Sequence, residues 1–294
     1  MRLLVNAALI AAAIVPYVTL SPSKGESQTL PSPSPAAPVS PSPAATTAPN
    51  PIGPSLGPND PCTSINAIVT RPSVTNSVCT VRPNHVLVET GYLNTSFRDG
   101  GNAVTYPNAA VRIGTQIPAL ELDVSPPTAQ RTNAGGVTTA TTDVGAGVKY
   151  VFGYTPRFNW GGQAFFTAPT GLNGGSSNGA TSVYALNAGY TLTPVFSLAT
   201  TLSSGSLTNG AQRWNSFVPS LVLGASLPNT TGLFAEIARF SNANGPGSGT
   251  RTQYLFGVSR GIGPRVQLDA STAFSPTAST GKYTSLGFGA SFYF

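Results

Sequence analysis

The chain ends with the nine residues Leu286-Gly287-Phe288-Gly289-Ala290-Ser291-Phe292-Tyr293-Phe294. Every second residue from Phe288 onward is apolar, and the residues between are small or polar, with an aromatic hydroxyl at Tyr293. Successive side chains of a strand point to opposite faces, so this stretch has one apolar face and one face of mostly small side chains. Transmembrane barrels turn apolar side chains toward lipid and place aromatic rings at the interface. The C-terminal signature of Phe288, Phe292 and Phe294 therefore predicts a membrane-spanning strand.

The composition of the whole chain favours strands over helices. Charged residues make up 8% of the 294 residues, against roughly 25% in an ordinary soluble domain. After residue 20, no stretch stays apolar over the roughly 20 residues that a transmembrane helix needs. The 32 glycines fit small lumen-facing positions. We predict an all-β fold: a transmembrane antiparallel up-and-down β-barrel of about 12 strands, preceded by a disordered Pro-rich segment.

The first 61 residues divide into two segments by composition. Residues 1–23 carry a basic residue and then an apolar run, which is typical of a signal peptide; since no Ala-x-Ala motif marks the cleavage site, retention as a membrane anchor is the alternative. Residues 24–61 are a linker rich in proline, serine and alanine, with almost nothing to bury. This linker is predicted to be a semi-rigid spacer, or a segment that threads the cell wall. Both segments indicate an exported protein with a periplasmic N-terminal part.

Cys62 and Cys79 are the only cysteines. An even pair in an exported chain predicts a structural disulfide, because a metal site would need further ligands. We therefore divide the rest of the chain into a small periplasmic disulfide-closed segment at residues 62–83 and a barrel at residues 84–294. No metal site and no cofactor are predicted.

The net charge of +6 does not predict a nucleic-acid partner, because the 15 basic residues are scattered and form no run or stripe. Several of them fall in or beside the long links between strands, where they either contact lipopolysaccharide phosphates or stay solvated. These residues are Arg98, Arg131, Arg213, Arg251 and Lys282.

Twelve segments show the period of two that is typical of strands. They are residues 84–93, 106–115, 118–125, 141–152, 157–167, 181–192, 194–204, 215–227, 231–241, 251–261, 264–275 and 282–294. Short turns alternate with long polar or Gly-rich links, as periplasmic turns and extracellular loops do in outer-membrane barrels. The predicted long links are residues 94–105, 125–140, 168–180, 205–215, 241–250 and 275–281. An even strand number places both barrel ends on the periplasmic side.

The same period assigns side chains to the two faces of the wall. Apolar side chains predicted to face lipid include Val144, Ala146, Val148, Tyr150, Phe158, Trp160, Ala164, Phe166, Tyr184, Leu186, Ala188, Tyr190, Leu268, Ala270 and Phe274. Polar side chains predicted to line the lumen are Glu89, Arg112, Glu121, Asp123, Asp143, Lys149, Gln163, Asn187, Glu236, Gln253, Gln267 and Asp269. Six of the nine acids fall inside, with only two bases. Such a lining is either a paired structural network or a path that favours cations.

Twelve tilted strands close a ring roughly 24 Å across and leave a passage of about 12 Å. Small solutes pass through such a barrel only if neither a long loop nor residues 62–83 fold inside it, since inward-folded segments plug many barrels.

The strand pattern resembles a family of outer-membrane barrels called the meta-pathway of phenol degradation family. The resemblance covers residues 84–294 and is carried by Asp143-Val144-Gly145-Ala146-Gly147-Val148-Lys149-Tyr150, Phe165-Phe166-Thr167-Ala168-Pro169-Thr170-Gly171, Ala188-Gly189-Tyr190, Leu192-Thr193-Pro194 and the C-terminal Phe-Tyr-Phe. It implies an outer-membrane barrel linked to uptake of aromatic or other hydrophobic compounds, and it implies no catalytic or binding residues.

Chemistry-bearing motifs are few. His85 is the only histidine, and its predicted place at the periplasmic end argues against the outer-leaflet triad of a barrel lipase. Thr280-Gly281-Lys282-Tyr283 lacks the flanking residues of a phosphate loop and is interpreted as a hairpin turn.

The sequence thus predicts a non-enzymatic pore or transporter in the outer membrane of a Gram-negative-type bacterium. Its predicted partners are outer-membrane lipid and lipopolysaccharide, the barrel-assembly machinery, a small-molecule solute and, through the linker, the cell wall. The alternative is a structural or surface-interaction barrel that is plugged, anchors the tether or displays its loops. A remote alternative is an outer-membrane hydrolase.

Overall fold

The structure is a computed structural model that describes residues 56–57, 60–98, 100–133, 136–242, 245–276 and 282–294. The predicted signal peptide and the predicted linker up to residue 55 lie outside the described residues. Within the described ranges, no helix is long and apolar enough to cross a membrane. The one named helix of this part of the chain is α2, the single turn Ile65–Ile68.

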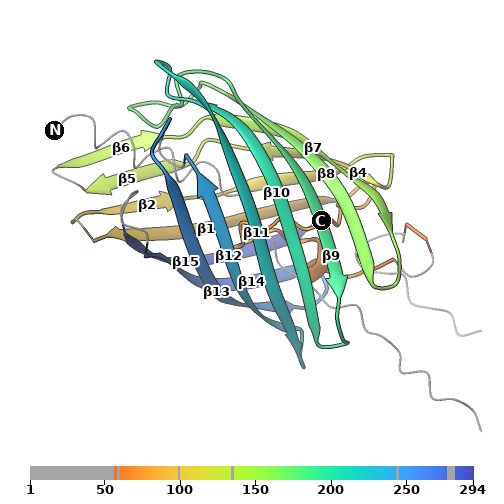
Figure 1. The fold of residues 1–294 in the computed structure, drawn as a ribbon. Coiled ribbons are helices and arrows are strands. Elements are labelled where there is room, and N and C mark those ends of the chain that lie inside the picture. The colour runs from red at the N-terminus through yellow and green to blue at the C-terminus, as the bar shows by residue number, and fades with distance from the viewer. Residues whose placement is uncertain (1–55, 58–59, 99, 134–135, 243–244, 277–281) are drawn as a thin grey trace, which may run out of the picture.

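Fifteen strands form one continuous antiparallel sheet (Figure 1). They are β1 Val86–Phe97, β2 Asn102–Tyr106, β3 Ala110–Gly114, β4 Leu120–Ser125, β5 Ala129–Asn133, β6 Val137–Thr141, β7 Val144–Tyr154, β8 Phe158–Ala168, β9 Thr181–Thr191, β10 Phe196–Thr208, β11 Arg213–Leu227, β12 Thr231–Ser241, β13 Thr250–Ile262, β14 Val266–Ser275 and β15 Tyr283–Tyr293. Strand β15 pairs with β1 over its whole length, from Leu87↔Tyr293 to Phe97↔Tyr283. This pairing closes the sheet into a barrel, so the predicted all-β fold is confirmed.

The closed ring contains twelve strands in the order β1, β3, β4 and β7 to β15. Beyond an interruption, β2 continues β3, β5 continues β4 and β6 continues β7. Past these interruptions β2 pairs with β5, just as β3 pairs with β4 within the ring. The interruptions contain Pro107 between β2 and β3, and Pro126 with Pro127 between β4 and β5. Proline has no N–H to donate to a strand ladder, so the pairing stops at these residues.

Three of the predicted long links are wrong in extent. Residues 94–105 hold the end of β1 and most of β2, and residues 125–140 hold β5 and most of β6. Residues 205–215 also belong mostly to strands, since β10 runs to Thr208 and β11 begins at Arg213. Polar and Gly-rich composition suggested loops there, but pairing with neighbouring strands satisfies these backbones.

The two faces of the wall differ as the period of two predicted. Phe288 is 57% exposed and Phe294 is 64% exposed, while Tyr293, between outward neighbours, is buried. The outward rings also contact one another across strands, as Phe166 does with Tyr184. A continuous apolar exterior of this kind is typical of a wall that faces lipid.

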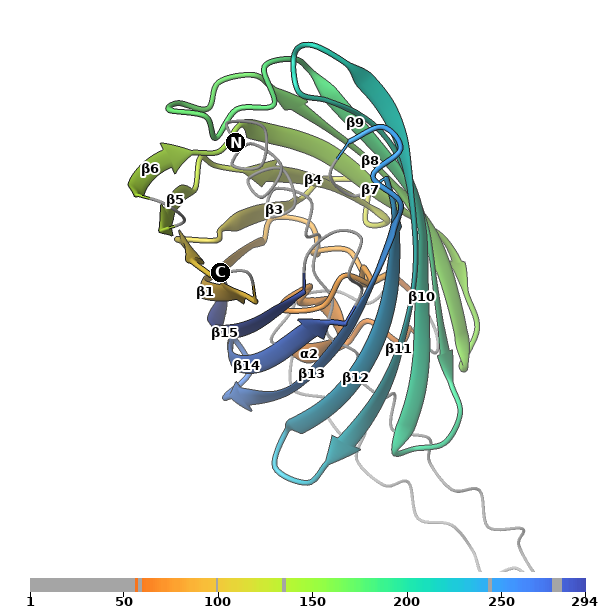
Figure 2. The same ribbon diagram turned by 60° about the vertical axis from the view of Figure 1, so that its left-hand side comes forward.

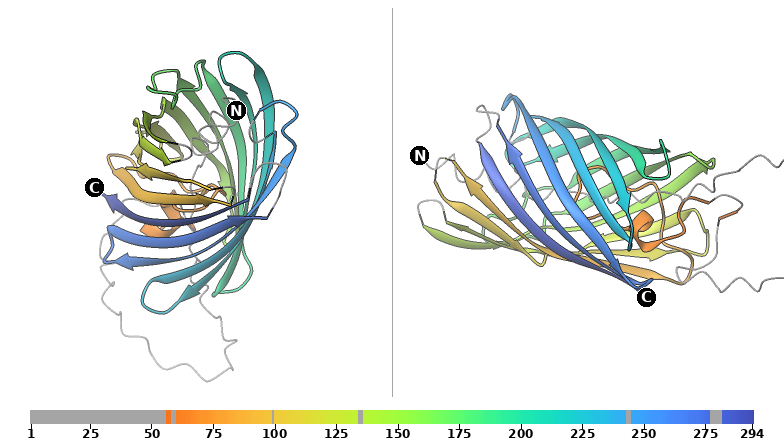
Figure 3. Two further views of the ribbon diagram at one scale, coloured as in Figure 1. Left: turned by 90° about the vertical axis from the view of Figure 1, so that its left-hand side faces the viewer. Right: turned by 90° about the horizontal axis from the view of Figure 1, so that it is seen from below.

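The chain from Asp60 to Arg82 lies inside the barrel near one end (Figures 2 and 3). We call residues 60–82 the plug. Most of its residues are buried, and it forms an apolar cluster with the wall residues Leu87 and Tyr293. The sequence predicted a small disulfide-closed segment at residues 62–83 and left open whether it folds into the barrel; in the structure this segment packs in the lumen. Its assignment to the periplasm stays a prediction.

Candidate functional site: the plugged lumen

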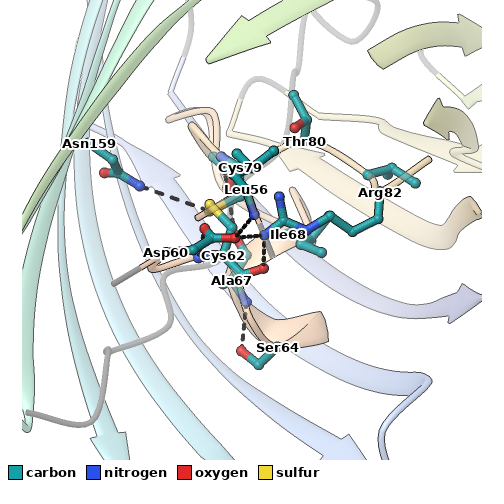
Figure 4. Close-up of a disulfide and its surroundings, with 12 residues drawn as sticks. Leu56, Asp60, Cys62, Ser64, Ala67, Ile68, Cys79, Thr80, Arg82 and Asn159 are labelled. Atoms are coloured by element: carbon teal, nitrogen blue, oxygen red, sulfur yellow. Dashed lines mark hydrogen bonds and ion pairs between the residues drawn. A yellow bond between two sulfur atoms is a disulfide. The ribbon is translucent and has the colours of Figure 1, made fainter. Parts of the chain in front are cut away.

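The two ends of the plug are tied together by a disulfide and a buried ion pair (Figure 4). Cys62 and Cys79 form the predicted disulfide, with 5.4 Å between their Cα atoms. Arg82 Nη2 pairs with the Asp60 carboxylate and donates to the Cys62 carbonyl oxygen at 2.6 Å. Asp60 also accepts from the Cys62 N–H at 2.9 Å. Contacts within the plug therefore close it into a loop, without any contact with the barrel wall.

Glu89, on β1, binds the backbone of the plug with both carboxylate oxygens. Its Oε1 accepts from the Thr70 N–H and its Oε2 from the Arg71 N–H, each at 3.0 Å. Arg112, on the neighbouring β3, donates to Glu89 Oε1 at 3.0 Å. Because the carboxylate is fully buried, these charge-assisted bonds compensate the loss of its hydration.

A network on β3, β4 and β7 holds the second part of the plug. Glu121 accepts from Arg112 Nε at 2.9 Å and from Lys149 Nζ at 2.8 Å, and it also accepts from the Val81 N–H at 2.6 Å. Arg112 donates in turn to the Cys79 carbonyl oxygen at 3.0 Å. One buried arginine thus joins two wall carboxylates to two parts of the plug.

Glu236, on β12, holds the middle of the plug from the opposite wall. It accepts from the Val74 N–H at 2.9 Å, and from the N–H and the hydroxyl of Thr75 at 2.6 Å each. Five strands separate β12 from β4 in either direction around the ring. The plug therefore crosses the full width of the lumen.

Arg71 packs the plug against the third side of the wall. Its Nε lies 3.5 Å from Asp269 Oδ2, and its Nη2 donates to the Phe288 carbonyl oxygen at 3.2 Å. A Cβ at Gly91 or at Gly289 would overlap the guanidinium. These two glycines on the inner face of β1 and β15 therefore make room for Arg71.

Beyond the plug, the lumen holds a cavity of about 160 Å³. Its charged lining contains two acids, Asp123 and Asp143, and two bases, Arg112 and Lys149. Its apolar lining includes Phe165, Val183 and Leu207 from β8, β9 and β10. The cavity lining can therefore contact both the polar group and the apolar part of a small molecule.

Asp143 binds the long β8–β9 link, whose residues Gly174 to Ser177 line this cavity. It lies at the interruption between β6 and β7 and accepts from the Gly171 N–H at 2.8 Å and the Ser177 N–H at 2.9 Å. Burial disfavours its ionised form, but the hydrogen bonds from Ser177 and Gly171 outweigh this effect and lower the pKa of Asp143 below its ordinary value.

The other predicted lumen residues also lie on the inner face. Gln163 donates to Asp123 at 3.0 Å, and Gln253 accepts from the Tyr283 hydroxyl at 2.5 Å. Asn187 accepts from the Thr201 hydroxyl at 2.8 Å, and Gln267 is fully buried. That the predicted set lines a conducting pore stays a prediction.

The charge balance inside the barrel differs from the predicted acid excess. Among the described residues, six carboxylates are buried, five of the wall and Asp60 of the plug, and so are five bases, Arg71, Arg82, Arg112, Lys149 and Arg251. Two of the added bases come from the plug. The third, Arg251, was predicted either to contact lipopolysaccharide or to stay solvated, but it is buried, and its guanidinium stacks inside over the rings of Phe240 and Tyr283. The acids of the lumen are largely paired.

Sequence reasoning missed the residues that the plug contributes, above all Thr70, Arg71 and Arg82. The signal was indirect: an interior with six acids and two bases needs further positive partners or N–H donors. His85, considered for a hydrolase, has its Nδ1 2.8 Å from the Pro83 carbonyl oxygen and its ring stacked on Tyr293. These contacts give it a packing role at the start of β1.

No family model and no curated protein matches the sequence, so the resemblance to the meta-pathway of phenol degradation family stays a prediction. Among solved structures, the chain is similar to the COG4313 outer membrane channel from Pseudomonas putida F1, with a TM-score of 0.58, 12% identity, and coverage of 74% of this chain and 98% of that one. It is also similar to the NanC porin, with a TM-score of 0.50, 12% identity, and coverage of 70% and 98%. The chain therefore has the fold of outer-membrane channel barrels.

Proposed function

We propose that this protein is a channel for small solutes in the outer membrane of a Gram-negative-type bacterium. The observation that carries this proposal is the cavity of about 160 Å³ that remains inside the barrel beyond the plug. A barrel with a purely structural role is most stable when its interior is closely packed. A cavity of this size lowers the stability, so a purely structural role does not explain it.

The lining of the cavity suggests the class of solute. An apolar cavity of about 150 Å³ is large enough for a benzene ring, and Phe165, Val183 and Leu207 offer an apolar surface here. Lys149 and Gln163, on neighbouring strands, offer hydrogen-bond donors. We therefore propose small aromatic or other hydrophobic compounds with a polar substituent as solutes.

Weak charge selectivity follows from the same lining. The sequence left a paired network and a path that favours cations as alternatives, and Arg112 and Lys149 lie beside Asp123 at the cavity. Opposite charges at close range cancel most of the field along the path. The proposed channel is therefore only weakly selective between cations and anions.

The orientation in the proposal follows from the turns. The plug and the C-terminus share the end of the barrel with short turns such as Thr155 to Arg157, and short turns face the periplasm in outer-membrane barrels (Figure 3). The linker before the plug would then lie in the periplasm, within reach of the cell wall. Lipopolysaccharide would surround the opposite end, and the barrel-assembly machinery would insert the chain.

A closed barrel that anchors the N-terminal tether is the second candidate. The observation that favours it is the extent of plug binding: Glu89 and Glu121 hold it from one side, Glu236 holds it from the opposite side, and Asp269 pairs with Arg71 between them. A plug held in this way leaves no path if it does not move.

Planar-bilayer recording of the refolded, disulfide-bonded protein distinguishes the two candidates. A channel gives discrete conductance steps, and under a tenfold salt gradient its reversal potential stays within about 15 mV of zero, since a perfectly selective pore reaches about 59 mV. Silence from protein that migrates as a folded barrel on unboiled gels contradicts the channel and favours the anchor.

A further inference from the structure

We infer that solutes pass the plug along the wall formed by β8, β9 and β10, and that Asn187 is the residue that decides passage there. This inference rests on the proposed channel function and names its path. It starts from a second cavity, of about 40 Å³, at the other side of the plug.

The two cavities lie along the same three strands. The small cavity is lined by Asn159, Gly189 and Ala199 of the wall and by Ser77 to Cys79 of the plug. The large cavity is lined by Gln163 and Ala185 of the wall and by Asn76 of the plug. The plug therefore borders both cavities with consecutive residues.

Strand register places one row of side chains between the cavities. Asn159, Gly189 and Ala199 pair across β8, β9 and β10, and so do Gln163, Ala185 and Ser203 two rows further on. The row between them consists of Gly161, Asn187 and Thr201. Residues two positions apart on one strand are separated by about 7 Å. A single layer of side chains thus separates the cavities.

Asn187 is the largest side chain of this middle row. Gly161 has no side chain, and Thr201 is engaged with the plug, since its Oγ1 accepts from the Asn76 N–H at 2.7 Å. Asn187 accepts from Thr201, but its Nδ2 has no hydrogen-bond partner among the described residues, although the residue is only 2% exposed. A buried donor without a partner is unfavourable, so a solute with an acceptor oxygen would bind it favourably.

This side of the plug is also its weakest attachment. Toward β1, β3, β4 and β12 the plug is held by carboxylates and arginine. Toward β8 to β10 the bonds are neutral: the Asn76–Thr201 bond, and Asn159 Nδ2 at 3.9 Å from Cys79 Sγ. Neutral hydrogen bonds are roughly half as strong as charge-assisted ones. Moving the plug away from β8 to β10 therefore breaks fewer strong bonds than moving it away from any other part of the wall. The path suits small solutes with a hydroxyl, carbonyl or carboxylate oxygen, which can accept from Asn187.

Cysteine labelling during bilayer recording tests the path. With Cys62 and Cys79 joined, Asn187→Cys carries the only free thiol. A small methanethiosulfonate reagent is expected to lower its conductance at least twofold. Ser291→Cys is the matched control, because this fully buried inward residue lies on β15, away from β8 to β10. Its conductance should not change. In parallel, Asn187→Ala removes the side chain and should raise conductance at least twofold.

Each outcome decides between the two proposals. Conducting Asn187→Cys protein that does not react, or that reacts by mass spectrometry without a change in current, overturns the path and leaves the channel function standing. An unchanged conductance of folded Asn187→Ala has the same meaning. Absence of current from the wild type and from every folded variant overturns the channel function, and the path with it.

Discussion

At the residue scale, the carboxylates of the lumen act as acceptors for the backbone of the plug. Glu89 and Glu236 each accept from two consecutive N–H groups, and Glu121 accepts from a third site at Val81. A carboxylate has two acceptor oxygens and no donor, so it suits a pair of adjacent amides. The three residues therefore position the plug by the same chemistry from different strands.

Replacing Glu236 with glutamine tests this role. Glutamine keeps one acceptor oxygen and adds an NH₂ group, so an N–H of Val74 or Thr75 loses its acceptor, at a cost of about 1–3 kcal/mol. We expect hydrogen exchange of residues 72–78, followed by mass spectrometry, to be roughly tenfold faster. Ser259→Ala, at a buried inward position of β13, is the control and should leave this exchange unchanged. Equal exchange in Glu236→Gln would show that Glu236 does not hold the plug.

Asp143 gives the long β8–β9 link a dependence on pH. Its hydrogen bonds lower its pKa in the folded protein, so ionised Asp143 stabilises the link above the ordinary carboxyl pKa. This contribution is lost as the pH falls through the lowered pKa of the folded state. We expect proteolysis of residues 169–180 by pepsin to accelerate as the pH falls below about 4. Asp143→Asn should show faster cleavage already at the upper end of that range and a smaller change with pH; an identical profile would contradict the assignment.

At the element scale, the plug has little regular structure of its own. Its one helix, α2, is a single turn capped by Ser64, and the rest is ordered by the wall and by the Cys62–Cys79 disulfide. Single helical turns are not stable alone in water. The disulfide reduces the number of conformations open to the loop, and hydrogen bonds to the wall carboxylates stabilise one of them.

The double variant Cys62→Ser/Cys79→Ser tests the contribution of the disulfide. Closing a loop of this length stabilises the closed form by about 3 kcal/mol. We expect exchange of residues 62–82 to increase strongly, while the paired amides of β8 to β14 keep their protection. The wild type under reducing conditions should behave in the same way. Unchanged exchange in both samples would mean that wall contacts alone order the plug.

At the scale of the whole molecule, the two surfaces of one sheet need opposite surroundings, apolar outside and polar inside. The outer surface carries exposed apolar side chains, such as Phe288 and Leu286, that only a lipid environment makes favourable. The inner surface carries buried charges that only pairing makes favourable. The alternation of the strands satisfies both at once, because inward charges such as Lys149 and Asp269 lie between outward apolar neighbours.

Arginine substitutions at two depths test the lipid face. Phe288 lies at the middle of β15 and Phe294 just beyond its end. In lipid vesicles, Phe288→Arg should lower the free energy of unfolding by about 2–4 kcal/mol, and Phe294→Arg by about 1 kcal/mol or less. Urea titration followed by tryptophan fluorescence measures both. Equal effects at the two positions would contradict the assignment of this face to lipid.

The sequence alone was enough to predict the twelve-strand barrel and its two faces, because a period of two is a local property of each strand. It was also enough to predict the Cys62–Cys79 disulfide, because the sequence has only these two cysteines. It was not enough for β2, β5 and β6, whose polar segments become strands only through their neighbours. It also left open whether residues 62–83 fold inside the barrel.

Only the tertiary structure decided what the inner residues do. Glu236 meets Val74 across 162 positions of sequence, and its partners there are backbone N–H groups, which every residue type except proline offers. No residue pattern marks such a contact. Asn187 likewise looks like any lumen-facing amide until the register of β8 to β10 places it between two cavities. Local periodicity determined the wall of this protein, and contacts between distant segments determined what fills it.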